Sequence, residues 1–177
     1  MPTSHIVTTT LQAAGLSATS NVLAQFIKTR RENRPFSLNL RALFQFVLFT
    51  LISCPPNILW QEFLEDKFPG YIIQTNGDKV LNKPNTARKF LFDQTLGAFV
   101  NTVAFVTAMA VFKGKSWKGV QREVERDVIP LMINSWKLWP LIALINFTFV
   151  PVNRRVIVAS VVGLFWGIYL SLFAALD

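Results

Sequence analysis

The sequence is poor in charged residues. Of its 177 residues only 16% are Asp, Glu, Lys or Arg, whereas an average soluble domain has about 25%. Hydrophobic residues account for 51% of the chain. This balance is the first indication of a membrane protein, and the length suits one transmembrane helical domain covering residues 1–177.

Nucleophiles and metal ligands are also scarce. The chain has one cysteine, Cys54, and one histidine, His5. A single cysteine excludes an intramolecular disulfide and a cysteine-based metal site. The scattered carboxylates form no base–nucleophile pair, and there is no glycine-rich phosphate loop. We therefore expect no enzymatic activity, no metal site and no cofactor.

Basic residues are missing from the first 27 positions. An arginine-rich mitochondrial presequence and a secretory signal both need early basic residues, so this start argues against either. The later basic residues give the chain a net charge of +8. They gather in polar gaps between apolar runs, which favours the lipid bilayer as their partner and argues against nucleic acid.

Four apolar runs predict membrane helices. Residues 6–27 have helical periodicity but one polar face, so they would span only against other helices. Residues 40–64, 90–112 and 156–176 are long enough to cross a bilayer. The second of the four should kink at Pro55 and Pro56. The pattern predicts an all-α integral membrane bundle of four to five transmembrane helices.

A fifth apolar run, residues 128–150, leaves the number of spans open. If it crosses the membrane, positive charge is divided between the two sides. If it re-enters or is broken, most positive charge falls on one side, as the positive-inside rule prefers. Pro130, Pro140 and Asn146 favour a broken helix inside the bundle. Four spans with a broken fourth run, and five spans, both remain open.

Two polar segments separate these runs. Residues 65–89 carry turn signals at Pro69-Gly70 and Asn76-Gly77 and predict a solvated connector. Residues 113–127 carry charges of both signs. Their apolar stripe, Trp117, Val120, Val124 and Val128, predicts an amphipathic interfacial helix. A soluble helix docked on a partner would show the same pattern.

A polar stripe marks residues 90–112. Asp93, Gly97 and Asn101 are four residues apart and should share one inward helix face. An ionisable residue within the bilayer is a functional candidate, although Asp93 could instead pair with Arg88 or Lys89 at the interface. The candidate polar lining of a solute path is Asp93, Gln94, Gly97, Asn101, Thr102 and Asn146. The same groups could serve only to join helices.

Small residues recur every four positions in the last run. They are Ala159, Gly163, Gly167 and Ser171, and they let another helix approach closely. That helix could belong to the same chain or to a second copy.

The end of the chain carries several motifs in a fixed order, at Trp136, Trp139, Pro140, Asn146, Phe147, Val150, Pro151, Arg155 and Trp166. These fingerprint residues resemble those of the Mpv-seventeen / peroxisomal membrane protein 22-kilodalton family, in its fungal peroxisomal-type branch. Asp93-Gln94 is similar to that family's pair at the start of the third helix. Ala143 departs from the pattern, because family members often carry glutamine there. We expect the fingerprint residues to be structural more than pore-lining.

The resemblance implies a peroxisomal membrane channel or permeability pathway for small solutes. The alternative is a self-associating scaffold that organises the organelle surface or tethers a soluble partner. The basic cluster after the first run resembles a peroxisomal targeting signal, which implies an import receptor as a partner. The mitochondrial inner membrane is the alternative location, and a homo-oligomer fits both functions.

Overall fold

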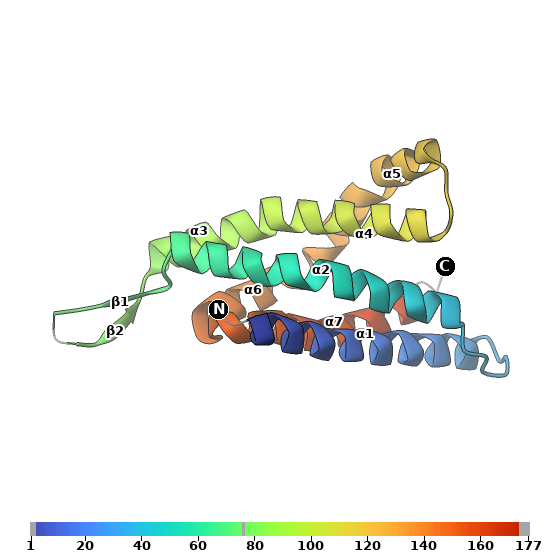
Figure 1. Cartoon of the computed structure of the whole chain (residues 1–177), viewed down its shortest axis with the longest axis horizontal. Coiled ribbons are helices and arrows are strands. Elements are labelled where there is room, and N and C mark those ends of the chain that lie inside the picture. The colour runs from blue at the N-terminus through green and yellow to red at the C-terminus, as the bar shows by residue number, and fades with distance from the viewer. Residues whose placement is uncertain (1–2, 76, 174–177) are drawn as a thin grey trace. The chain divides into compact units, whose positions relative to one another are not determined.

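The computed structural model describes residues 3–75 and 77–173, with side chains in the last helix as far as Ile168. Almost all of this is helix, as predicted (Figure 1). The helices are α1 (Thr3–Arg31), α2 (Leu40–Lys67), α3 (Lys83–Phe92), the π-helix η1 (Asp93–Gly97), α4 (Ala98–Phe112), α5 (Trp117–Ser135), α6 (Trp139–Phe149) and α7 (Val152–Phe173). The strands are β1 (Tyr71–Ile73) and β2 (Lys79–Leu81).

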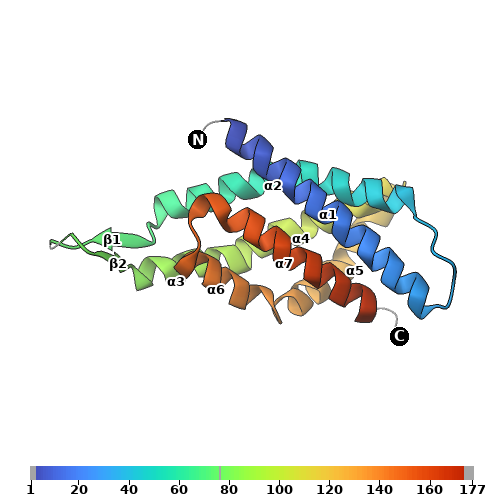
Figure 2. The ribbon, with the colours of Figure 1, turned by 90° about the horizontal axis from the view of Figure 1, so that it is seen from below.

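The chain divides into two compact units, Met1–Asn57 with Val156–Asp177, and Ile58–Arg155. In the first unit, α1 and α7 run side by side in the same direction (Figures 1 and 2). The hydroxyl of Ser20 donates to the carbonyl oxygen of Leu164 at 3.2 Å. A Cβ on Gly167 would lie 2.6 Å from that hydroxyl. Gly167 therefore gives α1 its close approach to α7.

The remaining small residues of α7 do not share this contact. A Cβ on Gly163 would meet none of the described residues within 4 Å. Ala159 is half-buried, and the side chain of Ser171 lies outside the described residues. The polar face of α1 is packed inward, since Thr9, Thr10 and Asn21 are buried there. The sequence predicted that the polar face of residues 6–27 would have to pack against other helices, and this burial agrees with that prediction.

Helix α2 continues through Pro55 and Pro56. The two prolines supply no N–H to the carbonyls one turn earlier. Next to them, the side-chain amide of Asn57 donates to the Ser53 carbonyl at 2.9 Å. The proline pair therefore does not end the helix, and the boundary between the two units follows it, between Asn57 and Ile58.

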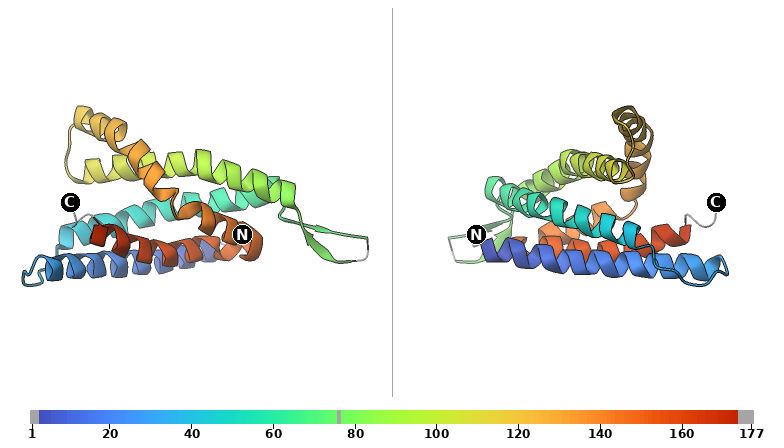
Figure 3. Two further views of the ribbon diagram at one scale, coloured as in Figure 1. Left: turned by 180° about the vertical axis from the view of Figure 1, so that it is seen from behind. Right: turned by 45° about the vertical axis from the view of Figure 1, so that its right-hand side comes forward.

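The second unit is built around one continuous helix, Lys83–Phe112, which contains α3, η1 and α4. Helix α5 turns back beside α4 (Figure 3), and Val106, Val128 and Met132 form the core between them. Helix α6 packs on α3, and Leu64, Ala143 and Phe147 form a second core there.

The predicted connector at residues 65–89 is wrong in its detail. Helix α2 extends to Lys67, α3 already begins at Lys83, and β1 pairs antiparallel with β2 between them. An Asn-Gly turn flanked by apolar, β-forming residues is a hairpin signal that the sequence offered. The side chain of Asn82 accepts from the Asn85 backbone N–H at 3.2 Å and caps α3.

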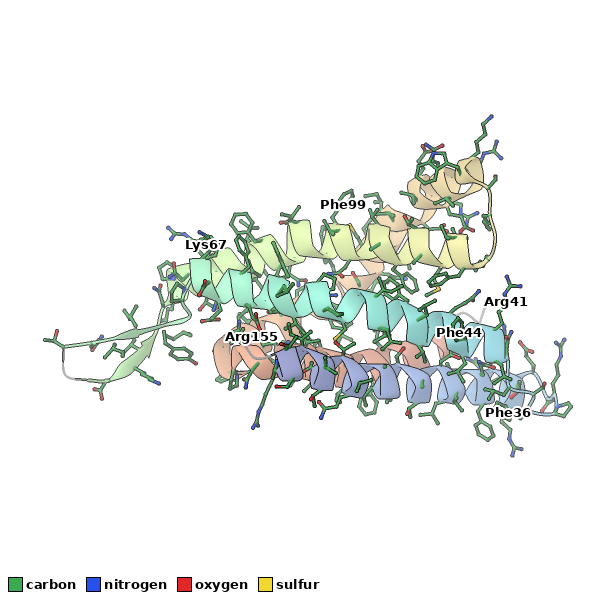
Figure 4. The ribbon with its side chains drawn as sticks, in the orientation of Figure 1. Phe36, Arg41, Phe44, Lys67, Phe99 and Arg155 are labelled. Carbon is green, nitrogen blue, oxygen red and sulfur yellow. The ribbon has the colours of Figure 1, made fainter. Side chains whose placement is uncertain are left out.

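Two described helices are long and apolar enough to cross a membrane, Leu40–Lys67 and Lys83–Phe112. The pair α5 and α6 becomes a third candidate if it counts as one span, with a bend of 58° between its halves. This bend confirms that the run at 128–150 is interrupted. The predicted span at 156–176 lies partly outside the described residues. Exposed phenylalanines such as Phe99 on α4 (Figure 4) suit contact with lipid.

The valine stripe of α5 packs against α4. Val120 and Val128 are each 3% exposed, whereas Trp117 is 69% exposed and lies outside the packed stripe. The amphipathic pattern is therefore confirmed with a narrower apolar face. Its interfacial position stays a prediction.

Candidate functional site

Two polar residues on α2 face two polar residues on the helix that follows the hairpin. Gln61 and Glu65 are four residues apart, as are Lys89 and Asp93, so each pair lies on one helix face. The Gln61 amide donates to Asp93 Oδ1 at 3.0 Å. Lys89 Nζ donates to Glu65 Oε2 at 2.7 Å. These two contacts hold α2 beside α3 and η1.

The first group, which we call the Asp93 cluster, consists of Trp60, Gln61, Asp93 and Gln94. Trp60 Nε1 donates to Asp93 Oδ1 at 3.2 Å, and Gln94 Nε2 donates to Oδ2 at 3.0 Å. Both carboxylate oxygens therefore accept hydrogen bonds. An ionised carboxylate is an acceptor only, so this arrangement suits the charged form.

A π-helical segment, η1, begins at Asp93 itself. A π segment inserts one residue into the helix and disturbs the regular hydrogen-bond ladder, and such segments often lie at functional sites. Trp136, in the break between α5 and α6, donates from Nε1 to the Gln94 carbonyl at 3.1 Å. The indole therefore satisfies a carbonyl of the irregular turn.

Gly97 closes the Asp93 cluster. A Cβ at this position would lie 2.9 Å from Trp60 Nε1, closer than side-chain carbons normally approach. The absence of a side chain lets the indole of Trp60 reach Asp93. The cluster therefore needs glycine at position 97 because there is no room for a side chain, and not because of its backbone conformation.

The second group, the Arg155 cluster, consists of Glu65, Lys89, Asn146, Phe147 and Arg155. Arg155 Nη2 lies 2.6 Å from Glu65 Oε2, the oxygen that also binds Lys89. The Lys89 side chain is fully buried and that of Arg155 is 4% exposed. Figure 4 labels Arg155, which lies in the first turn of α7.

Helix α6 holds Arg155 in place. Arg155 Nε donates to the carbonyls of Asn146 and Val150 at 3.2 and 3.1 Å, and the Asn146 amide donates back to the Arg155 carbonyl. The ring of Phe147 lies 5.1 Å from the guanidinium carbon and 5.5 Å from Lys89 Nζ. Both cations therefore lie against one aromatic ring, a favourable arrangement where water is excluded.

The ionisable groups of the two clusters are two bases and two acids. Lys89 and Arg155 are buried and both bind the half-buried Glu65, and the half-buried Asp93 is held by neutral hydrogen-bond donors. Charged groups inside a membrane are costly unless they are paired. This network meets that requirement with residues from three separate stretches of the chain.

Four polar atoms in the two clusters are buried without a hydrogen-bond partner. They are Gln61 Oε1 and Gln94 Oε1 in the Asp93 cluster, and Asn146 Oδ1 and Arg155 Nη1 in the Arg155 cluster. Native proteins rarely leave such atoms unsatisfied, and a water or an ion is the usual partner. The clusters therefore have capacity for a further polar species.

The predicted lining residues fall into two sets. Asp93, Gln94 and Gly97 meet in the Asp93 cluster, and Asn146 lies in the Arg155 cluster. Asn101 and Thr102 instead donate to carbonyls of their own helix, at Gly97 and Ala98. Lys89 binds Glu65 and not Asp93. Sequence reasoning missed Trp60, Gln61 and Glu65 and considered Lys89 only as a partner of Asp93, although the polar residues ending the apolar run of α2 were a usable signal.

The fingerprint residues lie mainly around these clusters. Asn146, Phe147, Val150 and Arg155 meet in or beside the Arg155 cluster, and Trp136 supports η1. Trp139 and Pro140 open α6, and Pro151 precedes α7. Trp166 is half-buried on α7, in the first unit. Ala143 is 7% exposed in the apolar core with Leu64, where a small apolar residue fits.

The described residues contain no group of three His, Cys, Asp or Glu side chains able to hold a metal ion.

Two candidate spanning helices joined by buried, paired charges define an integral membrane protein. The chain belongs to the Mpv17 / PMP22 family, whose model matches residues 110–171. This is the family that its fingerprint residues resemble.

Relatives extend the similarity along the chain. PXMP2/4 family protein 3 of Dictyostelium discoideum is 35% identical over 96% of this chain and 84% of that protein. Protein SYM1 of Kluyveromyces lactis is 27% identical over 93% of this chain and 80% of its own length. The mitochondrial inner membrane protein Mpv17 of Drosophila melanogaster is 27% identical over 72% of each chain. No solved structure matches this chain.

Proposed function

We propose that this protein forms a permeability pathway for small solutes across an organelle membrane, and that the Asp93 cluster is its polar constriction. The observation that supports this proposal most directly is a pair of buried amide oxygens, Gln61 Oε1 and Gln94 Oε1. They lie beside the carboxylate of Asp93, which belongs to a candidate spanning helix. Three oxygen-bearing side chains at one level can offer acceptors to water or to a hydrated cation.

The alternative use of the same residues is to join helices. The hydrogen bonds from Trp60, Gln61 and Gln94 to Asp93 support that use directly. Unsatisfied buried acceptors reduce stability, so the two amide oxygens suit the binding of a polar species such as water. The flux measurement below separates passage from a purely structural use. The proposal needs no catalytic group and no cofactor.

The organelle is the second part of the proposal. We propose the peroxisomal membrane, reached through a peroxisomal membrane-protein import receptor that binds the basic residues in the last turn of α1 and just after it. The mitochondrial inner membrane is the alternative, and the printed names of the Drosophila and Xenopus relatives support it. Fluorescence microscopy of the full chain with markers of both organelles separates the two locations.

Solute flux tests the pathway. Purified protein in vesicles loaded with a small polar solute should release that solute faster than empty vesicles. Trp60→Phe together with Gln61→Ala should alter the flux, because it removes two of the donors that position Asp93. Vesicles with the unaltered protein that are as tight as empty ones would refute the proposal.

A self-associating scaffold is the second candidate function. Its support is Gly163, where the structure leaves open space on α7 while Gly167 is occupied by α1. A second copy could use the Gly163 side of that helix. The size of the assembly in detergent decides between an oligomer and a monomer.

A further inference from the structure

One face of α5 changes its chemistry along the helix. Lys118, Arg122, Ile129 and Ile133 are spaced by four, seven and four residues, which places them within an arc of about 60°. Lys118 and Arg122 are exposed, and the two isoleucines are each 56% exposed. We call these four residues the α5 stripe. It is basic in the first turns of the helix and apolar in the last, with the exposed Glu125 at its edge between the two halves.

A neighbouring part of the α5 surface is already packed inside the protein. Val120, Val128 and Met132 are at most 7% exposed, and the last two pack with Val106 of α4. The apolar residues that would let α5 lie flat on a membrane are therefore used inside the protein. The exposed isoleucines at the far end of the α5 stripe need another apolar environment.

The basic residues of the stripe are available for binding. Arg126 pairs with Asp127 at 2.6 Å, and Lys115 pairs with Glu123. Among the described residues, neither Lys118 nor Arg122 takes part in an ion pair.

The spacing matches the layers of one lipid leaflet. Arg122 and Ile129 are about 10 Å apart along the helix axis at 1.5 Å per residue. A headgroup layer is about 5–8 Å thick beside a hydrocarbon core of about 30 Å. A helix that enters the bilayer steeply would put the basic residues at the phosphates and the isoleucines among the acyl chains. Together α5 and α6 are apolar enough to form one broken span.

We propose that the α5 stripe binds anionic phospholipid, with Lys118 and Arg122 on the phosphate group and Ile129 and Ile133 on the acyl chains. A phospholipid carries both features in one molecule, at the separation that the stripe offers. An acidic protein surface would match the basic half but leave the isoleucines exposed. This inference is independent of solute passage.

Native mass spectrometry of the full chain in detergent tests it, with phosphatidylglycerol and phosphatidylcholine of identical acyl chains as probes. Each basic residue near an anionic surface contributes about a five-fold gain in binding. Lys118→Gln with Arg122→Gln should therefore lower the preference for phosphatidylglycerol by about 25-fold. Lys79→Gln with Lys83→Gln, which removes the same charge elsewhere, should leave that preference unchanged.

Two further variants separate the halves of the stripe. Ile129→Ser with Ile133→Ser should weaken both lipids equally and keep their ratio. Lys118→Arg with Arg122→Lys keeps both positive charges and should keep the affinity for each lipid and the ratio between the two affinities. On size-exclusion chromatography the glutamine variant should elute with this charge-keeping variant if it is folded. The proposal fails if the glutamine pair keeps the preference, or if Lys79 and Lys83 matter as much. It also fails if the glutamine pair changes only the oligomer size, which would assign the stripe to a second copy.

Discussion

Trp136 donates a hydrogen bond from its indole nitrogen to the backbone carbonyl of Gln94 at 3.1 Å. Trp136 lies where α5 ends and the chain bends toward α6, and Gln94 lies in the π segment that begins at Asp93. A break in one helix is thereby joined to an irregular turn in another. Asp93 and Gln94 belong to this π segment, and Asp93 binds Trp60 and Gln61 of α2.

Trp136→Phe should destabilise the protein. The change keeps an aromatic ring but leaves the Gln94 carbonyl without its donor, at a loss of about 1 kcal/mol. Trp117→Phe is the matched control, because Trp117 is 69% exposed. Thermal unfolding in detergent should show a lower midpoint for the first variant only. Equal midpoints would mean that the hydrogen bond has no role in stability.

Gly97→Ala should displace Trp60. The new Cβ would lie 2.9 Å from Trp60 Nε1, and overpacking of this kind typically costs about 1–3 kcal/mol. Adding Trp60→Phe removes the clashing nitrogen, so the double variant should lose less than the sum of its two changes. Gly163→Ala, at an open position, should unfold like the parent. Additive losses would place the strain of Gly97→Ala somewhere other than Trp60.

In the Arg155 cluster, removing the acid Glu65 should destabilise the protein more than removing the base Lys89. Lys89→Met leaves Glu65 paired with Arg155, whereas Glu65→Gln leaves two buried cations without their shared carboxylate. Breaking a buried pair costs about 3–5 kcal/mol, and Glu65→Gln should be the more severe change. Asp66→Asn, at the exposed neighbour, should be mild. Unfolding midpoints in detergent give the order, and a greater loss for Lys89→Met would contradict it.

The two glycines of α7 separate packing within the chain from self-association. Gly167→Leu should disturb the contact of α1 with α7, because even a Cβ would lie 2.6 Å from the Ser20 hydroxyl. Gly163→Leu should leave the fold intact. If α7 joins two copies through Gly163, this variant should give a smaller assembly on size-exclusion chromatography. An unchanged assembly would remove the scaffold's self-association argument.

Helix periodicity predicted the main helices of this fold but not the phase of the polar stripe. The predicted face ran from Asp93 through Gly97 to Asn101 as one regular helix. The π segment at 93–97 inserts a residue and so rotates everything after it by about 100°. Gly97 is accordingly buried, whereas Asn101 and Ala104 are exposed. Nothing in a single sequence marks such an insertion.

The partners of Asp93 were beyond prediction for a different reason. Trp60 and Gln61 lie more than thirty positions earlier in the chain, and only the packing of α2 beside α3 brings them near. An interruption within residues 128–150 was one of two open predictions, favoured by Pro130, Pro140 and Asn146, and the structure places it between α5 and α6. Local signals thus indicated most helices and this interruption, while the charge pairing depended on the tertiary arrangement.

The reversal potential of reconstituted protein in a planar bilayer tests the central claim most directly. The unaltered protein should conduct. Asp93→Asn removes one of two carboxylates that balance Lys89 and Arg155, so its reversal potential in a salt gradient should shift toward anion permeability. Thr102→Val removes a hydroxyl that, among the described residues, bonds to its own helix at Ala98, and this variant should match the parent. Conductance with the same reversal potential in all three proteins, or no conductance at all, would contradict the account.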